Sequence, residues 1–438
     1  MVNNAAMQFA DRAYLAHDSM EALEAVLPAG MLMWIFAGFF QSVVGYSNVF
    51  VGQYHGAGDV HGCRESYRAA TVIAICSGLL SLPLLPLGEW LLELSTLSDT
   101  VLSLEKRYFS VVMLGAFFVY GQTAAASYFT GRGRTRIVFW VNLLGNALNV
   151  AVDPVLIFGF DVSLFGTRLS LEPLGIAGAA YATVLSMALQ WAVLTFAVRR
   201  ESAAAGAEPW WPAMRRLPRI LRFGVPSGLY SVLNILSFTI FVFVTGGVGE
   251  MELAVSNACF TVNYLLFAPM EGFSIGASTL VAQAIGRGDP DGAVRDARRT
   301  ILLGAGFVAV FSALALVFAK PLLTLFASGS LAADASRMAE FQSLGFTLMV
   351  LMAAWQVFDA TDVILSGALK GAGDTKFVMV WMLITSFAFW LPMVFAVRSL
   401  HNTMPALWST MVVYVVVICA GSFVRWHYGR WRRIRVVG

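Results

Sequence analysis

Long uninterrupted stretches of apolar residues recur along the whole chain, and they constrain its fold more than any other feature. About 20 consecutive apolar residues form a helix that crosses the roughly 30 Å hydrocarbon core of a bilayer. Of the 438 residues, 58% are apolar and only 13% are charged, which is more apolar surface than a soluble core absorbs. We therefore expect an all-α integral membrane protein with spans at 26–53, 69–92, 108–130, 137–160, 174–198, 223–244, 254–285, 301–319, 341–369, 377–397 and 405–424.

The segment 1–16 is apolar but too short to cross a bilayer by itself. We interpret it as the second half of a further, apparently truncated helix and expect an upstream in-frame extension of about 15–30 residues to complete it. The chain then has twelve transmembrane helices.

Basic residues in the connections predict the orientation. If the loop after residue 53 is cytoplasmic and the sides alternate from there, most of the 29 Lys and Arg residues fall on the cytoplasmic side. We expect a multi-pass protein of the plasma (inner) membrane with both termini in the cytoplasm, and we expect it to be a monomer.

The two halves of the chain resemble each other. VGQYHGAGDVHGCRESYR at 51–68 and VAQAIGRGDPDGAVRDAR at 281–298 share seven of eighteen residues, and GRGRTR at 131–136 pairs with GAGDTK at 371–376. Both copies of each loop fall on the cytoplasmic side, so the repeat unit holds six helices and the halves are related by an axis along the membrane normal. We expect six-helix bundles at 1–205 and 223–438, joined by a cytoplasmic interfacial linker at 206–222.

The glycine loops do not indicate nucleotide binding, because neither follows a strand or ends in Lys-Ser/Thr. Asp59 and Asp289 instead suit the cap of the next helix, with Gly62 and Gly292 following them. The four cysteines and five histidines form no ligand cluster, and no basic block is interleaved with aromatics. We therefore expect no cofactor, no metal beyond a coupling Na⁺, and no nucleic-acid partner.

Acidic and amide side chains inside the spans are the candidate functional residues, because an ionisable group there costs about 3 kcal/mol. Asp11 lies in the incomplete first helix, beside Arg12. Asn149 and Asp153 are four residues apart and share one helix face, followed by Pro154, which bends the chain and frees carbonyls.

The second half carries its own carboxyl groups: Asp359 and Asp362, three residues apart in one span, and Glu271 after Pro269 in another. No Lys or Arg lies mid-span to neutralise them. Acidic groups without basic partners predict a proton or Na⁺ site and a cavity that tolerates cations; in the plainer alternative they are hydrogen-bonded or lie near helix ends.

Several segments resemble the multidrug and toxic compound extrusion (MATE) family. They are GRGRTRIVFWVNLLGNALNVAVDPVLIFG at 131–159, LGIAGAAYAT at 174–183, Gly224-Val-Pro226, LVAQAIGRGD at 280–289 and LSGALKGAGDT at 365–375. The resemblance covers nearly the whole chain. It implies two six-helix bundles around a central cavity and export of amphipathic, often cationic compounds in exchange for Na⁺ or H⁺.

The resemblance also implies roles for particular residues. A cation site in the first half would use Asp11, Asn149, Asp153 and Thr183, and Asp359 would be a coupling carboxylate in the second half. Where some members carry Glu in the seventh helix, this chain has Asn234, which weakens the case for a Na⁺ site there. Asp359, Asp362, Asn234 and Glu271 are therefore the candidates for second-half coupling.

We expect a cation-coupled antiporter that exports small amphipathic molecules by alternating access. The alternative transporter is a lipid-linked sugar flippase of a related superfamily, although such proteins usually have more helices and a basic cavity. A membrane enzyme is disfavoured because no span carries a nucleophile and base pair or a His-rich metal motif. A structural or sensory membrane protein would not need paired carboxylates.

Overall fold

The computed structural model describes residues 11, 14–15, 19–94, 98–164, 167–202, 211–326 and 334–437. Within them the chain divides into two compact units, with the boundary between Gly228 and Leu229. Almost all of the described residues are helical.

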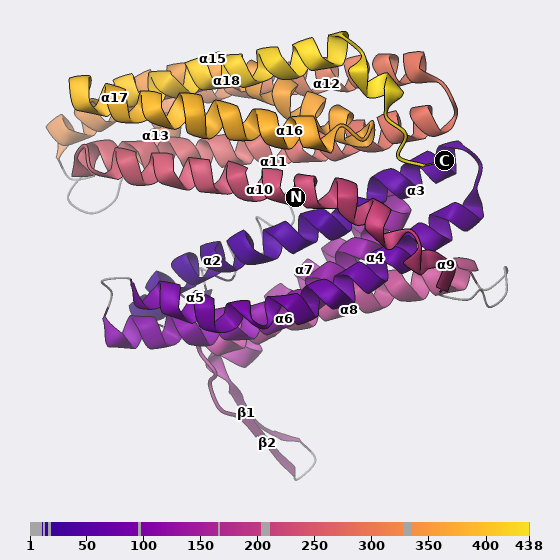
Figure 1. The fold of residues 1–438 in the computed structure, drawn as a ribbon. Coiled ribbons are helices and arrows are strands. Elements are labelled where there is room, and N and C mark those ends of the chain that lie inside the picture. Colours follow the sequence, from indigo (N-terminus) through magenta and orange to yellow (C-terminus); the bar gives the residue numbers. More distant parts are fainter. Residues whose placement is uncertain are drawn as a thin grey trace. The chain divides into compact units, whose positions relative to one another are not determined.

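The amino-terminal unit is built around a long central helix. Helix α6 packs against α2, α4 and α8, and α7 packs against α8 (Figure 1). The core near the α3–α4 turn includes Val51, Tyr128 and Phe129. The helices are α2 (Met20–Gly45), α3 (Ser47–Gly56), α4 (Val60–Ser81), α5 (Leu84–Glu93), α6 (Asp99–Gly131), α7 (Thr135–Phe158), α8 (Ile176–Ser202), α9 (Trp211–Met214) and the start of α10 (Leu217–Gly246).

The carboxyl-terminal unit is centred on α15, which packs against α11, α12 and α18. Its core is rich in aromatic rings, among them Trp355, Trp390 and Trp408. Besides the rest of α10, it contains α11 (Glu250–Gly286), α12 (Pro290–Val317), α13 (Ala319–Phe326), α15 (Ala335–Gly371), α16 (Thr375–Leu383), a π-helical segment (Ile384–Trp390), α17 (Leu391–His401), α18 (Met404–His427) and a 3₁₀ turn (Arg430–Arg433).

The described residues contain ten helices long and apolar enough to cross a membrane, or eleven if the bent pair α4 and α5 forms one span. These helices cover the eleven predicted spans apart from a few terminal residues. Helices α4 and α5 meet at an angle of 46°. The predicted twelfth span, in segment 1–16, lies almost wholly outside the described residues, as do Arg12 and the start of the predicted linker.

The first repeated loop has the same geometry in both units. Asp59 Oδ1 accepts a hydrogen bond of 2.7 Å from the Gly62 amide, and Asp289 Oδ1 accepts one of 2.7 Å from the Gly292 amide. The capping prediction is therefore confirmed. The preceding glycines, Gly58 and Gly288, have φ of 75° and 74°, a left-handed conformation in which a Cβ would be strained.

The second repeated loop also begins with the same close contact in both units. A Cβ on Gly131 would lie 2.6 Å from the Asn48 carbonyl oxygen, so α6 approaches α3 backbone to backbone. Gly371 makes the corresponding approach of α15 to the Ser278 carbonyl on α11. The sequence repeat therefore preserves a helix contact that only a glycine allows.

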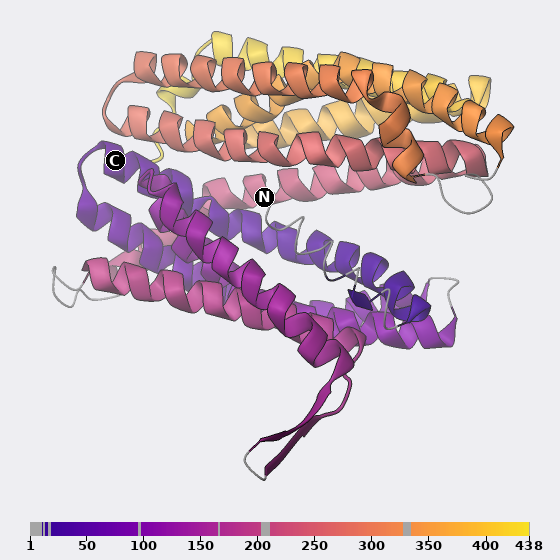
Figure 2. The ribbon, with the colours of Figure 1, turned by 180° about the vertical axis from the view of Figure 1, so that it is seen from behind.

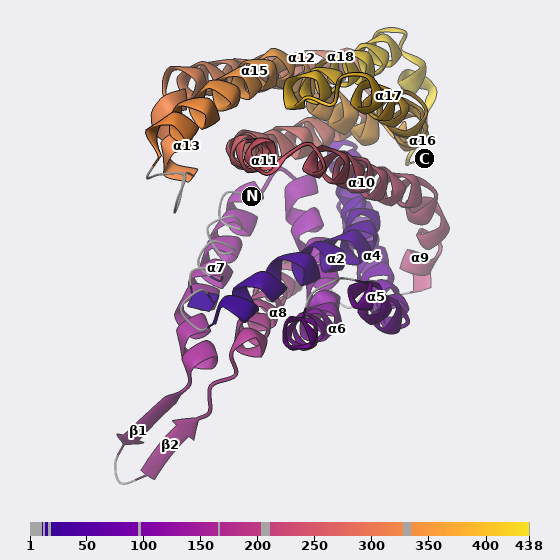
Figure 3. The same ribbon diagram turned by 90° about the vertical axis from the view of Figure 1, so that its left-hand side faces the viewer.

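A β-hairpin that the sequence analysis did not predict connects α7 to α8. Strands β1 (Phe160–Leu164) and β2 (Thr167–Leu171) are antiparallel, with Phe160 opposite Leu171 and Leu164 opposite Thr167. The hairpin projects beyond the helices of its unit (Figures 2 and 3).

An ion pair fixes the entrance to α10 within the amino-terminal unit. Arg216, just before α10, places its Nε atom 2.7 Å from Glu65 Oε2 on α4 and its guanidinium 4.3 Å from the Tyr54 ring centre. Glu65 is only 5% exposed, so this pair is shielded from water. The contact attaches the predicted linker at 206–222 to the first repeated segment at 51–68.

Candidate functional site

Helix α7 buries two polar side chains on one face. Asn149 and Asp153 are both 0% exposed, and Asn149 Nδ2 lies 3.5 Å from Asp153 Oδ1, a long hydrogen bond. Pro154 lies inside α7, which continues to Phe158. The four-residue spacing therefore places both side chains on one helix face, as predicted, and that face is buried.

Helix α8 supplies the third group. It approaches α7 closely, because a Cβ on Gly178 would lie only 2.5 Å from the Leu156 carbonyl oxygen. One turn further on, Thr183 is 5% exposed and its Oγ1 lies 3.5 Å from Asn149 Nδ2. Asn149 thus links the two helices by contacting a side chain on each side.

Asp11 completes the cluster from the beginning of the chain. Its side chain is 5% exposed and interacts with the carboxyl group of Asp153. The structure therefore brings together the four residues proposed for the first half: Asp11, Asn149, Asp153 and Thr183. Whether they bind a cation stays a prediction.

The chemistry of this cluster suits a hard cation or a proton. Two carboxyl groups, an amide and a hydroxyl supply oxygen atoms, which are the ligands that hard cations prefer. Asn149 Oδ1 and Asp153 Oδ2 are buried, and no described residue gives either a hydrogen bond. Buried polar atoms without partners are costly, so a cation or proton shared among these oxygens would stabilise the site.

The carboxyl-terminal unit holds a second charged cluster. Asp359 interacts electrostatically with Asp362 and Glu271, and Asp362 is only 4% exposed. The Ser422 side chain on α18 forms a hydrogen bond to Asp362. Asn234 does not share this burial, because its side chain is exposed.

The prediction that no basic group accompanies these carboxylates was wrong. Lys370, near the end of α15, interacts with both Glu271 and Asp362, and its Nζ lies 3.7 Å from the centre of the Tyr230 ring. Lys370 lies just beyond the predicted span 341–369, but helical side chains lean toward the amino terminus, so it reaches back along α15. Lys370 and Tyr230 are the residues that sequence reasoning missed here.

Close helix packing holds the second cluster together. Gly367 and Gly371 on α15 lie against the backbone of Ser274 and Ser278 on α11. The Ser274 hydroxyl also donates a 2.8 Å hydrogen bond to the Val363 carbonyl. Small residues at this spacing let two helices approach closely, which brings Glu271 on α11 beside the acidic turn of α15.

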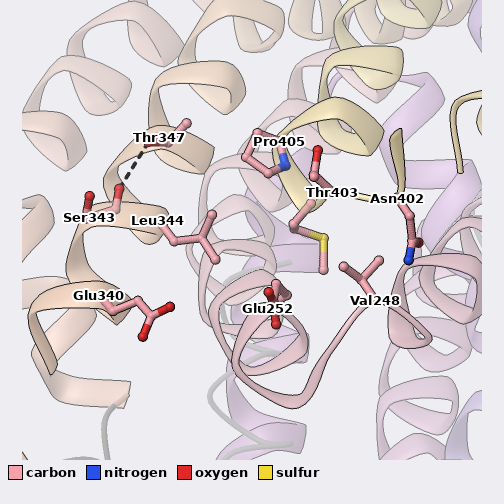
Figure 4. Close-up of a pocket in the computed structure, with 10 residues that line it drawn as sticks. Val248, Glu252, Glu340, Ser343, Leu344, Thr347, Asn402, Thr403 and Pro405 are labelled. Carbon is pink, nitrogen blue, oxygen red and sulfur yellow. Dashed lines mark hydrogen bonds between the residues drawn. The ribbon is translucent and has the colours of Figure 1, made fainter. Parts of the chain in front are cut away.

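A hollow of about 440 Å³ lies elsewhere in the carboxyl-terminal unit, away from the charged cluster. Glu252, Glu340, Leu344 and Thr403 are among its lining residues, at the starts of α11, α15 and α18 (Figure 4). None of the charged cluster residues lines it. We therefore place the functional chemistry in the two buried clusters and not in this hollow.

Comparison with known families decides what kind of protein carries these clusters. The family model described as MatE matches residues 1–155 and 226–396, which include Asp11, Asn149, Asp153, Asp359 and Glu271. The chain belongs to the MatE family. The resemblance found in the sequence is thereby confirmed.

Individual relatives of this MatE chain are distant in sequence, but their similarity extends over most of the chain. A probable multidrug resistance protein NorM of Thermotoga maritima is 24% identical over 98% of this chain and 89% of its own length. A probable NorM of Rhizobium meliloti is 28% identical over 81% of this chain and 73% of its own length. The crystal structure of a eukaryotic MATE transporter, AtDTX14, superposes with a TM-score of 0.82 at 18% identity, covering 98% and 93% of the two chains.

Family membership establishes the class of the molecule. MatE proteins are membrane transporters and not enzymes, and the apolar helices of this chain agree with a multi-pass membrane protein. The solved structure shares the fold.

Proposed function

We propose that this chain is a cation-coupled antiporter that exports amphipathic, cationic drugs or toxic compounds by alternating access. The relatives described as multidrug resistance proteins support the substrate class. The observation that carries the coupling is the convergence of Asp11, Asn149, Asp153 and Thr183 on one buried cluster.

Electrostatic repulsion provides the coupling in this proposal. Two carboxylates held side by side in a dry interior repel each other unless a proton or Na⁺ lies between them. A cation therefore binds most tightly in the conformation that brings Asp11 against Asp153. A ligand shifts a conformational equilibrium only by its differential affinity for the two states, and this arrangement supplies such a difference.

The membrane setting of the proposal follows the basic loops. We place the protein in the plasma membrane with both termini in the cytoplasm, so that the coupling cation enters from outside while the substrate leaves. The acidic cluster of the carboxyl-terminal unit, partly neutralised by Lys370, suits an amphipathic cation better than an anionic lipid-linked sugar.

Uptake of a fluorescent organic cation into everted vesicles tests the proposal, because export in these vesicles moves the substrate from the outside into the lumen. The Na⁺ gradient and the pH gradient are imposed separately, and each is compared with vesicles that lack the protein. Export driven by one gradient supports the proposal and identifies the coupling ion. Absence of export under both gradients, together with movement of a lipid-linked sugar, would support the flippase alternative instead.

A further inference from the structure

A small, partly open cavity in the amino-terminal unit has many amide side chains in its lining. It has a volume of about 60 Å³ and lies among α2, α6, α7 and α8. Its lining includes the apolar side chains of Trp34, Val119 and Met187. The rest of the lining consists of five amide side chains and one hydroxyl: Gln41, Gln122, Asn142, Asn146, Gln190 and Ser186. No lining residue is charged. We call this space the amide chamber.

The polar groups of the amide chamber are only partly satisfied by one another. Gln122 Nε2 donates to Asn142 Oδ1 at 3.1 Å, and Gln41 Nε2 donates to Thr123 Oγ1 at 3.4 Å. Ser186 is 1% exposed, and its hydroxyl has no hydrogen-bond partner among the described residues. A cavity of this volume with several polar groups in its wall has room for several water molecules, since each needs about 10–15 Å³ of such volume.

The amide chamber adjoins the buried carboxylate cluster. On α7, Asn142 and Asn146 lie on the same face as Asn149 and Asp153, at successive helical turns. On α8, Ser186 and Gln190 follow Thr183 at the same kind of spacing, and α7 packs against α8. A continuous polar stripe therefore runs for about 16 Å along α7, from Asp153 to Asn142.

The polar stripe is buried at one end and becomes more exposed toward the other. Asn149 is 0% exposed and Asn146 is 7% exposed, whereas Asn142 and Gln122 are half-buried. The more exposed end of the stripe lies toward the side of the unit where α6 and α8 end and α7 begins. There Arg132 and Arg134 both form ion pairs with Glu201 at the end of α8. The basic loops predict that this end is cytoplasmic.

We propose that the amide chamber is a water-filled passage through which the coupling cation, Na⁺ or H⁺, travels between the Asp11–Asp153 cluster and the cytoplasmic end of the unit. This inference rests on the proposed function. Neutral amide and hydroxyl oxygens suit transit, because they replace hydration water without holding the ion as tightly as carboxylates do.

Silver ions test whether the amide chamber is open to water and cations. Ag⁺ is a small monovalent cation that reacts with thiols. The chain is prepared with Cys63, Cys76, Cys259 and Cys419 replaced by alanine, and single cysteines are introduced as Ser186→Cys and Asn142→Cys. Ala182→Cys is the matched control on α8, because Ala182 is 0% exposed and does not line the amide chamber.

Each variant is treated with Ag⁺ in chloride-free everted vesicles, and the remaining thiols are counted after denaturation. We expect Asn142→Cys to react first, Ser186→Cys next and Ala182→Cys last. The passage is refuted if Ser186→Cys reacts no faster than Ala182→Cys. It is equally refuted if Ser186→Cys reacts only in right-side-out vesicles. Neither labelling result depends on whether the protein exports a substrate.

Blocking the amide chamber tests its role in transport. Ser186→Val and Asn142→Leu fill it with apolar atoms, while Thr195→Val removes a hydroxyl from α8 outside it. We expect about a tenfold lower export rate for the two blocking variants, equivalent to a barrier about 1.4 kcal/mol higher. The substrate concentration for half-maximal rate should not change. Wild-type export rates in folded blocking variants would overturn the passage while leaving the proposed function intact.

Discussion

The Nδ2 atom of Asn149 lies 3.5 Å from the Oγ1 atom of Thr183, although the two residues are 34 positions apart in the chain. Because Asn149 also contacts Asp153 on its own helix, this one amide connects α7, α8 and the carboxyl pair. The cluster is therefore a product of helix packing and not of a local motif.

Removing the Thr183 hydroxyl should weaken cation coupling without unfolding the protein. Thr183→Val keeps the shape of the side chain but loses one oxygen, which costs about 1 kcal/mol, or about a fivefold higher half-saturating cation concentration. The measurement is export rate against Na⁺ or H⁺ concentration. Thr183→Ser is the control and should stay near wild type. Identical cation curves for the Val and Ser variants would contradict a role for the hydroxyl.

Lys370 should stabilise the carboxyl-terminal unit by neutralising its acidic cluster. Lys370→Met leaves Glu271 and Asp362 without their cation, and we expect a loss of about 1–3 kcal/mol in unfolding free energy. Adding Glu271→Gln should restore part of that loss, because it removes one of the repelling charges. Thermal unfolding in detergent measures both. Strictly additive losses in the double variant would show that the two residues are not coupled.

The close approach of α15 to α11 should make Gly371 intolerant of any side chain. A Cβ at Gly371 meets the Ser278 backbone, so Gly371→Ala should cost about 1–3 kcal/mol through overpacking. Gly276→Ala, on α11, is the matched control, because a Cβ there meets nothing within 4 Å. It should be neutral or stabilising by up to about 1 kcal/mol. Equal stability of the two variants by thermal unfolding would argue against this helix contact.

The second repeated loop contains a charge pair whose two residues should tolerate being exchanged. Asp374 is 4% exposed and accepts hydrogen bonds from Arg425 Nε at 2.6 Å and from a terminal guanidinium nitrogen at 3.2 Å. Asp374→Asn should lower the unfolding free energy by about 1–3 kcal/mol. The exchange of both residues, Asp374→Arg with Arg425→Asp, should recover part of this, since the first unit pairs Arg134 with Glu201. A double exchange less stable than either single variant would refute the pairing as a unit.

Hydrophobic pattern and repeat predicted most of the fold, because both depend on residues close together in sequence. The spans follow from apolar length, and the caps at Asp59 and Asp289 follow from local turn chemistry. The hairpin at 160–171 was missed because its two strands are only five residues long and Phe160 fell in a predicted span, although Phe160, Val162 and Leu164 alternate with polar residues.

The candidate site was likewise predictable only where its residues are close together in the sequence. Asn149 and Asp153 could be paired from their spacing alone. Thr183 and Asp11 were assigned to the site from the family resemblance, because a local sequence pattern does not predict which distant helices pack together. Lys370 was assigned to a loop because the predicted span 341–369 ends just before it, and only the helix contact at Ser274 and Ser278 shows which carboxylates it reaches.

The central claim is that the buried carboxyl pair couples export to cation entry, and Asp153→Asn tests it most directly. The substitution keeps the size of the side chain but removes the charge, so the repulsion that a proton or Na⁺ relieves no longer exists. Export of a fluorescent cation is measured in everted vesicles under the gradient that drives the wild-type protein, at matched protein levels and with folding checked by thermal unfolding. The account predicts that gradient-driven export is abolished in a folded protein that remains in the membrane. Export at the wild-type rate under the same gradient would contradict it.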